Sequence, residues 1–330
     1  MNMRLFLDTA AKSKTKRALP ILSFPAAQKL NVSIDELVKD SVLQADAMEI
    51  VAGKTDTIAA VSLMDLSVEA EAFGANVRFS KDEVPAVIDR LITNENEAKA
   101  LKVPALDKGR AGICIEGVRL AKQRILDKPV FAGMIGPFSL AGRLMDVTEI
   151  MYMCYDEPQT VHIVLEKANE YLINYGKALK LAGADGIILA EPLAGVLSPD
   201  MAIEFSVSYV KQIIKELKSD EFAIIYHNCG NAVVSMLDDI FSQDASAYHF
   251  GNAIDMQKVM SLTPDDIICM GNIDPISEFV KGTPQSMRNA VKELLNKCGG
   301  LNNFILSSGC DVPFNASWDN IAAFFSALYD

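Results

Sequence analysis

Three side chains with metal-binding chemistry stand out in the sequence. His227 and Cys229 form one close pair, and Cys310 follows the pair by 81 positions. Imidazole nitrogen and thiolate sulfur are common zinc ligands, and a structural zinc normally has four of them in two short-spaced pairs. No second pair is present here, and three ligands with an open fourth position are typical of a catalytic zinc. The alternative is a chance His-x-Cys with buried free thiols.

Each ligand follows a short apolar run with strand character. Residues 222–226 precede the His-x-Cys pair, and residues 304–306 precede Cys310. The carboxyl ends of parallel strands are where α/β enzymes build their sites. We therefore expect these three side chains to converge on one site.

Glu191 also ends a strand-like run, residues 186–190, and directly precedes Pro192. We expect its side chain to point into the same site. There it would be a fourth, displaceable metal ligand, an acid/base, or a carboxylate that orients His227 by hydrogen bonding.

Eight such runs alternate with helix-length segments along the chain. The runs are residues 19–24, 57–63, 130–134, 186–190, 223–226, 247–250, 267–270 and 304–307. This order predicts the α/β class and a (β/α)8 TIM barrel, in which the strand ends meet at one mouth. No GxGxxG motif follows the first run, which disfavours a doubly wound sheet. Without a repeat or a Pro/Gly linker, we expect a single domain over residues 1–330.

Local signals refine this prediction. The clearest helix spans residues 158–181, with proline in its first turn, and Ser198 and Ser317 are expected to start two others. Residues 64–128 exceed one strand–helix unit, so we expect an insertion after strand two, with a hairpin strand near 77–79 and helices. It would lie on the catalytic face as a lid or a partner surface, or form a second small domain.

Composition excludes several classes of protein. A net charge of −12 argues against binding to nucleic acid or to an anionic membrane surface. No apolar run reaches the roughly 18 residues that a membrane span needs. Six cysteines are scattered without a disulfide framework, so we expect a soluble cytoplasmic protein. Four of them lack a partner at ligand spacing and are expected to be core or surface thiols: Cys114, Cys154, Cys269 and Cys298.

Several segments together resemble a known superfamily. Residues 135–142 (IGPFSLAG), 193–199 (LAGVLSP) and 271–275 (GNIDP) resemble the uroporphyrinogen decarboxylase superfamily, a (β/α)8 fold. Residues 64–74 (MDLSVEAEAFG) resemble its zinc-dependent, corrinoid-linked methyltransferase branch, whose hallmark is the His-x-Cys pair with a distant third cysteine. That branch includes the methylcobamide:coenzyme M methyltransferases and components of methanol, methylamine, chloromethane and aryl-ether demethylating systems. The resemblance runs from about residue 15 to the C-terminus.

The decarboxylases of this superfamily carry an arginine-rich segment after the first strand that holds substrate carboxylates. The matching residues 23–28 contain no arginine, so a porphyrinogen would find no bidentate partners there. Asp65 occupies the position of the decarboxylases' catalytic aspartate, but the methyltransferase branch keeps an aspartate too. Decarboxylation of a tetrapyrrole is the second hypothesis, and a non-catalytic barrel with a structural zinc is the third.

The resemblance implies two directions of methyl transfer. Zinc would hold a thiol such as coenzyme M as a thiolate that accepts the methyl group. Alternatively, it would activate a methyl ether, alcohol or amine as donor, while cob(I)alamin attacks the methyl group. The Asp-x-His-x-x-Gly corrinoid motif is absent, so the corrinoid is expected on a separate partner protein that docks over the mouth. We expect a monomer or a homodimer.

Positions at strand ends also suggest roles for other residues. Asp65 would contact substrate or a metal ligand, or else cap a helix. His249 would contact substrate or the corrinoid, or else be a structural histidine. Asn272 is a further cofactor-binding candidate at the end of its strand, although we expect Asn272 and Asp274 to fix the turn that follows rather than to do chemistry.

Overall fold

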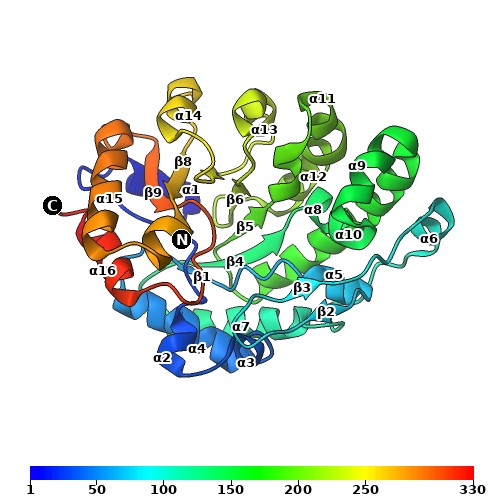
Figure 1. Ribbon diagram of the computed structural model, residues 1–330, viewed down its shortest axis with the longest axis horizontal. Helices are drawn as coiled ribbons and strands as arrows, with labels where there is room; N and C mark the ends of the chain where they lie inside the picture. Colours follow the sequence, from blue (N-terminus) through cyan, green and yellow to red (C-terminus); the bar gives the residue numbers. More distant parts are fainter.

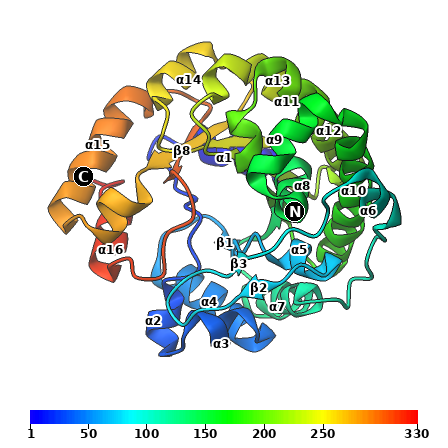
Figure 2. The same ribbon diagram turned by 45° about the vertical axis from the view of Figure 1, so that its right-hand side comes forward.

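The predicted barrel is confirmed by the computed structural model, which describes all 330 residues. Seven parallel strands form one curved sheet in the order β1-β4-β5-β6-β7-β8-β9. They are β1 (Ala60–Val61), β4 (Val130–Ile135), β5 (Gly186–Ala190), β6 (Ala223–Asn228), β7 (Ala247–Phe250), β8 (Cys269–Ile273) and β9 (Phe304–Ser308). Ala18 makes parallel bridges to Leu306 and to Thr57. The segment around Ala18 therefore takes the place of the eighth strand and closes the ring (Figures 1 and 2).

The strands alternate between two buried faces. Ile225 of β6, Ala247 of β7 and Ile305 of β9 belong to a small apolar cluster inside the ring, which helix α1 (Met3–Ala11) joins from one end. Their sequence neighbours on the other face, such as Ile224, belong to the large core between the strands and the helices. Because side chains alternate along a strand, residues two positions after an interior residue also face the interior.

Helices surround the ring of strands, as Figure 2 shows. The α-helices after α1 are α2 (Ala26–Leu30), α3 (Ile34–Val38), α4 (Ser41–Lys54), α5 (Val68–Phe73), α6 (Glu95–Ala100), α7 (Ala111–Arg124), α8 (Pro137–Met145), α9 (Val147–Asp156), α10 (Pro158–Leu181), α11 (Pro199–Ala202), α12 (Ser208–Leu217), α13 (Leu237–Phe241), α14 (Met256–Leu262), α15 (Pro284–Cys298) and α16 (Trp318–Ser326). Short 3-10 or π turns are η1 (Pro192–Val196), η2 (Ile203–Val207), η3 (Val233–Met236) and η4 (Pro275–Val280). None of these helices is both long enough and apolar enough to cross a membrane.

The helix boundaries follow local signals in the sequence. Helix α10 has the predicted bounds, with Pro158 in its first turn, where a missing amide hydrogen costs nothing. The side chains of Ser198 and Ser317 accept hydrogen bonds from backbone amides of α11 and α16, so both predicted helix starts are confirmed.

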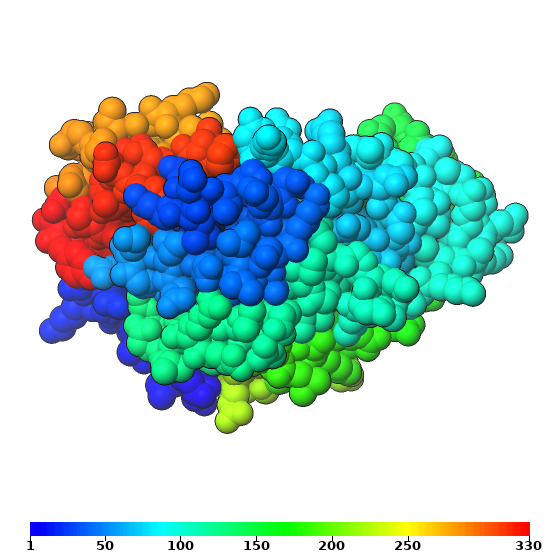
Figure 3. Space-filling model, turned by 90° about the horizontal axis from the view of Figure 1, so that it is seen from below, coloured from blue at the N-terminus to red at the C-terminus, as the bar shows by residue number.

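The chain between β1 and β4 holds helices α5, α6 and α7 and a two-stranded antiparallel sheet. Strand β2 (Val77–Arg78) lies within the predicted 77–79 run and pairs with β3 (Ala86–Val87). Figure 3 shows the cyan part of this segment extending along one side of the molecule, beyond the helices α2 to α4 in blue. Helix α7 packs along α4, which anchors the segment to the barrel wall.

Candidate metal centre

The structure brings His227, Cys229 and Cys310 together at the carboxyl ends of β6 and β9. One ligand atom from each residue lies within 4.8 Å of the others, and Cys310 Sγ is 3.7 Å from His227 Nε2. Zinc bonds of about 2.0 Å to nitrogen and about 2.3 Å to sulfur place tetrahedral ligand atoms roughly 3.5–3.8 Å apart. The side chains therefore fit a tetrahedral metal ion with three protein ligands.

The pKa values of the two cysteines of this group are shifted in opposite directions. A hydrogen bond from Cys310 lowers the pKa of Cys229 to about 7, against the opposing effect of burial. The same bond, together with burial, raises the pKa of Cys310 to about 12. One sulfur is thus ready to lose its proton near neutral pH, as a metal-binding thiolate must. Four other cysteines are free thiols outside the group: Cys114, Cys154, Cys269 and Cys298.

Glycines allow very close packing around the turn that carries Cys229. A Cβ atom added to Gly251 would lie 2.5 Å from Cys229 Cβ and 2.6 Å from its Cα. On the other side, a Cβ atom on Gly195 would lie 2.6 Å from Gly230 Cα. Only hydrogen fits at either place, so the 193–199 motif supplies a glycine that the metal-binding turn packs against.

His249 lies beside His227 because neighbouring strands β6 and β7 place the two residues in register. The side chain is fully buried, and the two Nδ1 atoms are 2.7 Å apart. Its Nε2 is 2.7 Å from Ser307 Oγ. Burial, and then the neighbouring His227, lower the pKa of His249 well below its usual value, so the ring is neutral. Both ring nitrogens of His249 therefore form hydrogen bonds within the protein, and one of these bonds holds the ring of His227.

Glu191 is not brought to the metal-binding group. Its carboxylate is fully buried and accepts hydrogen bonds at the N-terminus of α8, from Phe138 N at 3.0 Å and from Ser139 N and Oγ at 2.6 and 2.5 Å. Burial raises its pKa to about 7, although these donors oppose the shift. Interior residues of β5 include Ile188, so Glu191 belongs to the alternate, helix-facing set. It secures the loop after β5 to α8.

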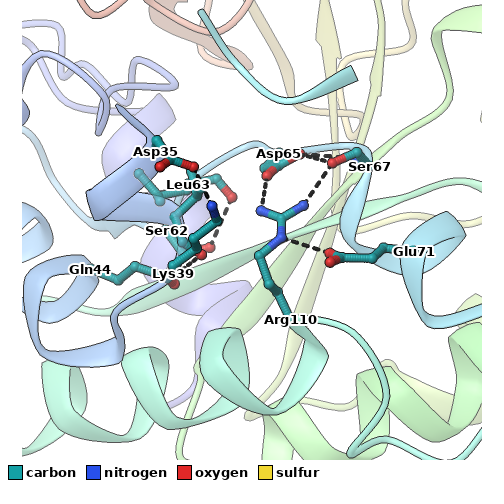
Figure 4. Close-up of polar contacts among 10 residues, drawn as sticks. Asp35, Lys39, Gln44, Ser62, Leu63, Asp65, Ser67, Glu71 and Arg110 are labelled. Carbon is teal, nitrogen blue, oxygen red and sulfur yellow. Dashed lines mark hydrogen bonds and ion pairs between the residues drawn. The ribbon is translucent and has the colours of Figure 1, made fainter. Parts of the chain in front are cut away.

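Asp65 is held in a buried ion-pair network, which Figure 4 shows. It pairs with Arg110, which also binds Glu71 Oε2 through Nε at 2.6 Å and Ser67 Oγ through Nη2 at 2.8 Å. The Arg110 guanidinium also lies 4.9 Å from the centre of the Phe79 ring. Asp65 additionally accepts a hydrogen bond from Ser67 N at 3.0 Å. The network therefore ties the start of the inserted segment, just after β1, to the start of α7.

The remaining strand-end candidates hold turns. Asn272 Nδ2 donates to the carbonyl oxygens of Gly251 and Ile254, both at 2.9 Å. Asp274 accepts hydrogen bonds from Ile276 N and Ser277 N at the start of η4. Asn272 thus ties β8 to the Gly251 turn that packs on Cys229.

Sequence reasoning missed two polar residues near the centre. Ser307 meets His249 inside the barrel. The sequence shows that Ser307 shares a strand face with Ile305, two positions earlier, but only the closed barrel shows that this face is the interior. Asp311 follows Cys310 directly, and its Oδ1 is buried without a hydrogen-bond partner. Burial, and then the nearby Cys310, raise the pKa of Asp311 well above its usual value.

Replacing Glu69 with Gln is expected to make stability less dependent on pH. Glu69 Oε1 accepts a hydrogen bond from Ile135 N at 3.0 Å, but the buried Oε2 has no partner. Burial raises the pKa from 4.5 to about 7, so stability from this group is full below pH 4.5 and is lost as the pH rises toward 7. When the pH is raised from about 5 to about 8, the free energy of unfolding in urea should fall by about 2 kcal/mol more for wild type than for the variant. Equal losses would contradict the raised pKa.

Comparison with known proteins agrees with this architecture. The family model described as uroporphyrinogen decarboxylase (URO-D) matches residues 3–330. The methylcobamide:CoM methyltransferase MtbA of Methanosarcina acetivorans is 26% identical over 255 residues, 75% of this chain and 72% of that protein. The uroporphyrinogen decarboxylase of Protochlamydia amoebophila is 29% identical over 257 residues, 76% of this chain and 68% of that protein.

Among solved structures, a methyltransferase from Methanosarcina mazei superposes with a TM-score of 0.86 at 22% identity, covering 99% of this chain and 98% of that one. The likeness extends over the whole barrel and its inserted segment. With the family model matching nearly every residue, the chain belongs to the uroporphyrinogen decarboxylase family.

Proposed function

We propose that the protein is a zinc-dependent methyltransferase that exchanges a methyl group with a corrinoid carried by a separate protein. The observation that carries this proposal is the group of three ligand atoms from His227, Cys229 and Cys310 at the mouth of the barrel. No carboxylate or fourth His or Cys belongs to the group, so a tetrahedral metal would keep one position for substrate.

The relatives named methylcobamide:CoM methyltransferases support transfer from a methylated corrinoid to a thiol such as coenzyme M. When bound, zinc would lower the pKa of the substrate thiol and keep its sulfur as the nucleophilic thiolate. The protein's own contribution is to hold the metal with two cysteines and one histidine, and to fix those residues through the glycine contacts and through His249.

Tetrapyrrole decarboxylation is the competing function within the family. The segment after the first strand, residues 23–28, supplies no cation for substrate carboxylates. The side chain of Gln28 in this segment is held within the protein, because its Nε2 donates hydrogen bonds to the carbonyl oxygens of Phe314 and Ala316. This segment therefore favours methyl transfer over decarboxylation.

The proposal is tested by incubating the zinc-loaded protein with methylcobalamin and coenzyme M, and following the loss of the methylcobalamin spectrum. Methylation of coenzyme M, with slower reaction of thiols that lack its sulfonate, is the expected result. If no thiol reacts, cob(I)alamin with methanol, methylamines or a phenyl methyl ether tests the reverse direction. Failure in both directions, with release of CO2 from uroporphyrinogen, would establish the decarboxylase instead.

Adding one methyl group at Gly251 is expected to weaken zinc binding. In Gly251→Ala the new Cβ overlaps Cys229, so either the turn moves or strain of about 1–3 kcal/mol builds up. We expect zinc affinity, measured by competition with a chelator, to fall about tenfold or more. The matched control is Gly53→Ala, because a Cβ atom there meets nothing within 4 Å. Equal affinities of the two variants would count against the close packing.

A further inference from the structure

We infer that Ser307 and His249 are positioning residues that fix the tautomer of His227 and thereby present its Nε2 lone pair to the metal. This inference rests on the proposed metal centre and adds a hydrogen-bond chain that begins at a backbone carbonyl. The chain runs from Leu19 O through Ser307 Oγ and His249 to His227.

The direction of the chain is set at Ser307. Its hydroxyl has one proton, and it donates that proton to Leu19 O at 2.7 Å. A carbonyl oxygen can only accept, so no other arrangement puts a proton between these two oxygens. Ser307 Oγ can therefore only accept from His249 Nε2, which is 2.7 Å away. His249 must carry its proton on Nε2.

The next link follows from the 2.7 Å contact between the Nδ1 atoms of His249 and His227, which holds a single proton. The His249 ring is fully buried, and its nitrogens are hydrogen-bonded to a hydroxyl and to another imidazole, not to a carboxylate that could balance a second ring proton. A neutral ring with its proton on Nε2 has a lone pair on Nδ1. That lone pair lies 2.7 Å from His227 Nδ1 and can only accept a proton from it.

His227 is thereby protonated on Nδ1, and its Nε2 carries the lone pair. Nε2 is the atom that lies 3.7 Å from Cys310 Sγ, on the metal-binding side of the ring. Without the chain, a neutral imidazole populates both tautomers, and one of the two would aim an N–H at the metal. A ligand held by such an outer hydrogen bond typically binds metal about 10–100-fold more tightly.

The barrel geometry explains why these residues meet. His227, His249 and Ser307 each lie two positions after an interior apolar residue of their strand, namely Ile225, Ala247 and Ile305. They form one polar layer above an apolar interior. Leu19 belongs to the segment that closes the ring next to β9, so ring closure itself orients the metal ligand.

Nitrogen NMR on the metal-free protein, labelled with 15N-histidine, tests the tautomer directly. The sequence has three histidines: His162→Gln identifies the one on the outer helix α10, and correlating each remaining ring with its own backbone resonances assigns His227 and His249. We expect His227 protonated on Nδ1 and His249 on Nε2, each as a single neutral tautomer. A proton on His227 Nε2, or an averaged pair of tautomers, would overturn the inference. Because no metal or substrate is present, this readout is independent of methyl transfer.

A second test of the positioning role compares the zinc affinities of paired variants. Ser307→Ala and His249→Leu should each lower affinity about 10–100-fold, and His249→Asn should restore much of it because its Oδ1 can accept from His227. Ser308→Ala is the matched control: this neighbouring serine is equally buried, but its hydroxyl accepts from Ile21 N. If Ser307→Ala and Ser308→Ala lower the zinc affinity equally, the cause is a general packing effect, and the assigned role is overturned. If wild type binds no zinc, the proposed function fails, whereas the tautomer result still stands.

Discussion

Cys229→Ser is expected to lose bound zinc and to lower kcat/KM for methyl transfer by a thousandfold or more, about 4 kcal/mol of transition-state stabilisation. The hydroxyl of serine stays protonated at neutral pH, whereas the pKa of Cys229 is lowered to about 7 by the hydrogen bond from Cys310. The variant thus removes one of two anionic ligands. Metal analysis after dialysis, with initial rates on the same samples, measures both effects.

The control for this experiment is Cys114→Ser, a half-buried free cysteine outside the metal-binding group. It should keep both zinc and activity. The melting temperature separates a catalytic from a structural metal: Cys229→Ser should melt close to wild type, because the large core between strands and helices does not involve the site. A variant that loses zinc and unfolds together would support a structural zinc. Wild-type zinc content together with wild-type activity in Cys229→Ser would contradict the proposed function.

Arg110→Met is expected to destabilise the protein by about 3–5 kcal/mol, the usual cost of leaving a buried charge unpaired. Arg110 is 4% exposed and joins Asp65 to Glu71 and Ser67. Methionine fills much of the same volume but leaves the Asp65 carboxylate buried without its partner. The free energy of unfolding in urea measures the loss.

The matched control is Arg119→Met, since Arg119 pairs with Glu116 in an exposed ion pair on α7, the helix that Arg110 directly precedes. Such a pair contributes only about 0–1 kcal/mol. Similar losses in the two variants would show that burial of the Asp65 network contributes little. The double variant Arg110→Met with Asp65→Asn should recover part of the stability, because it removes the unpaired charge as well.

Local patterns were sufficient for much of the fold. Eight strand-like runs give the seven strands and the closing segment, because each run is short and mostly apolar. The bounds of α10 and the starts at Ser198 and Ser317 follow from capping, which involves only nearby atoms. The inserted segment was recognised from its length, but its anchor at Arg110 was not.

The position of Glu191 differs from the prediction, which considered where its strand ends but not which face of the strand its side chain is on. Its place after a strand suggested a side chain in the mouth. The strand alternates, however, and Ile188 faces the interior, so Glu191 points to the helices and binds the N-terminus of α8. The sequence shows that side chains alternate along the strand, but only the closed barrel shows which of the two alternating sets faces the interior.

By itself, the sequence determined the residue types of the candidate metal centre and the strand ends that carry them: His227, Cys229 and Cys310 combine suitable chemistry with strand-end positions. Only the tertiary structure decided what supports them. Ser307 is 58 positions from His249, and Arg110 is 45 positions from Asp65. Whether such pairs touch depends on how the strands are staggered when the ring closes, and no local pattern encodes that stagger. The chemistry of the candidate ligands is therefore set by the residue types in the sequence, whereas their orientation is set by the packing of the whole barrel.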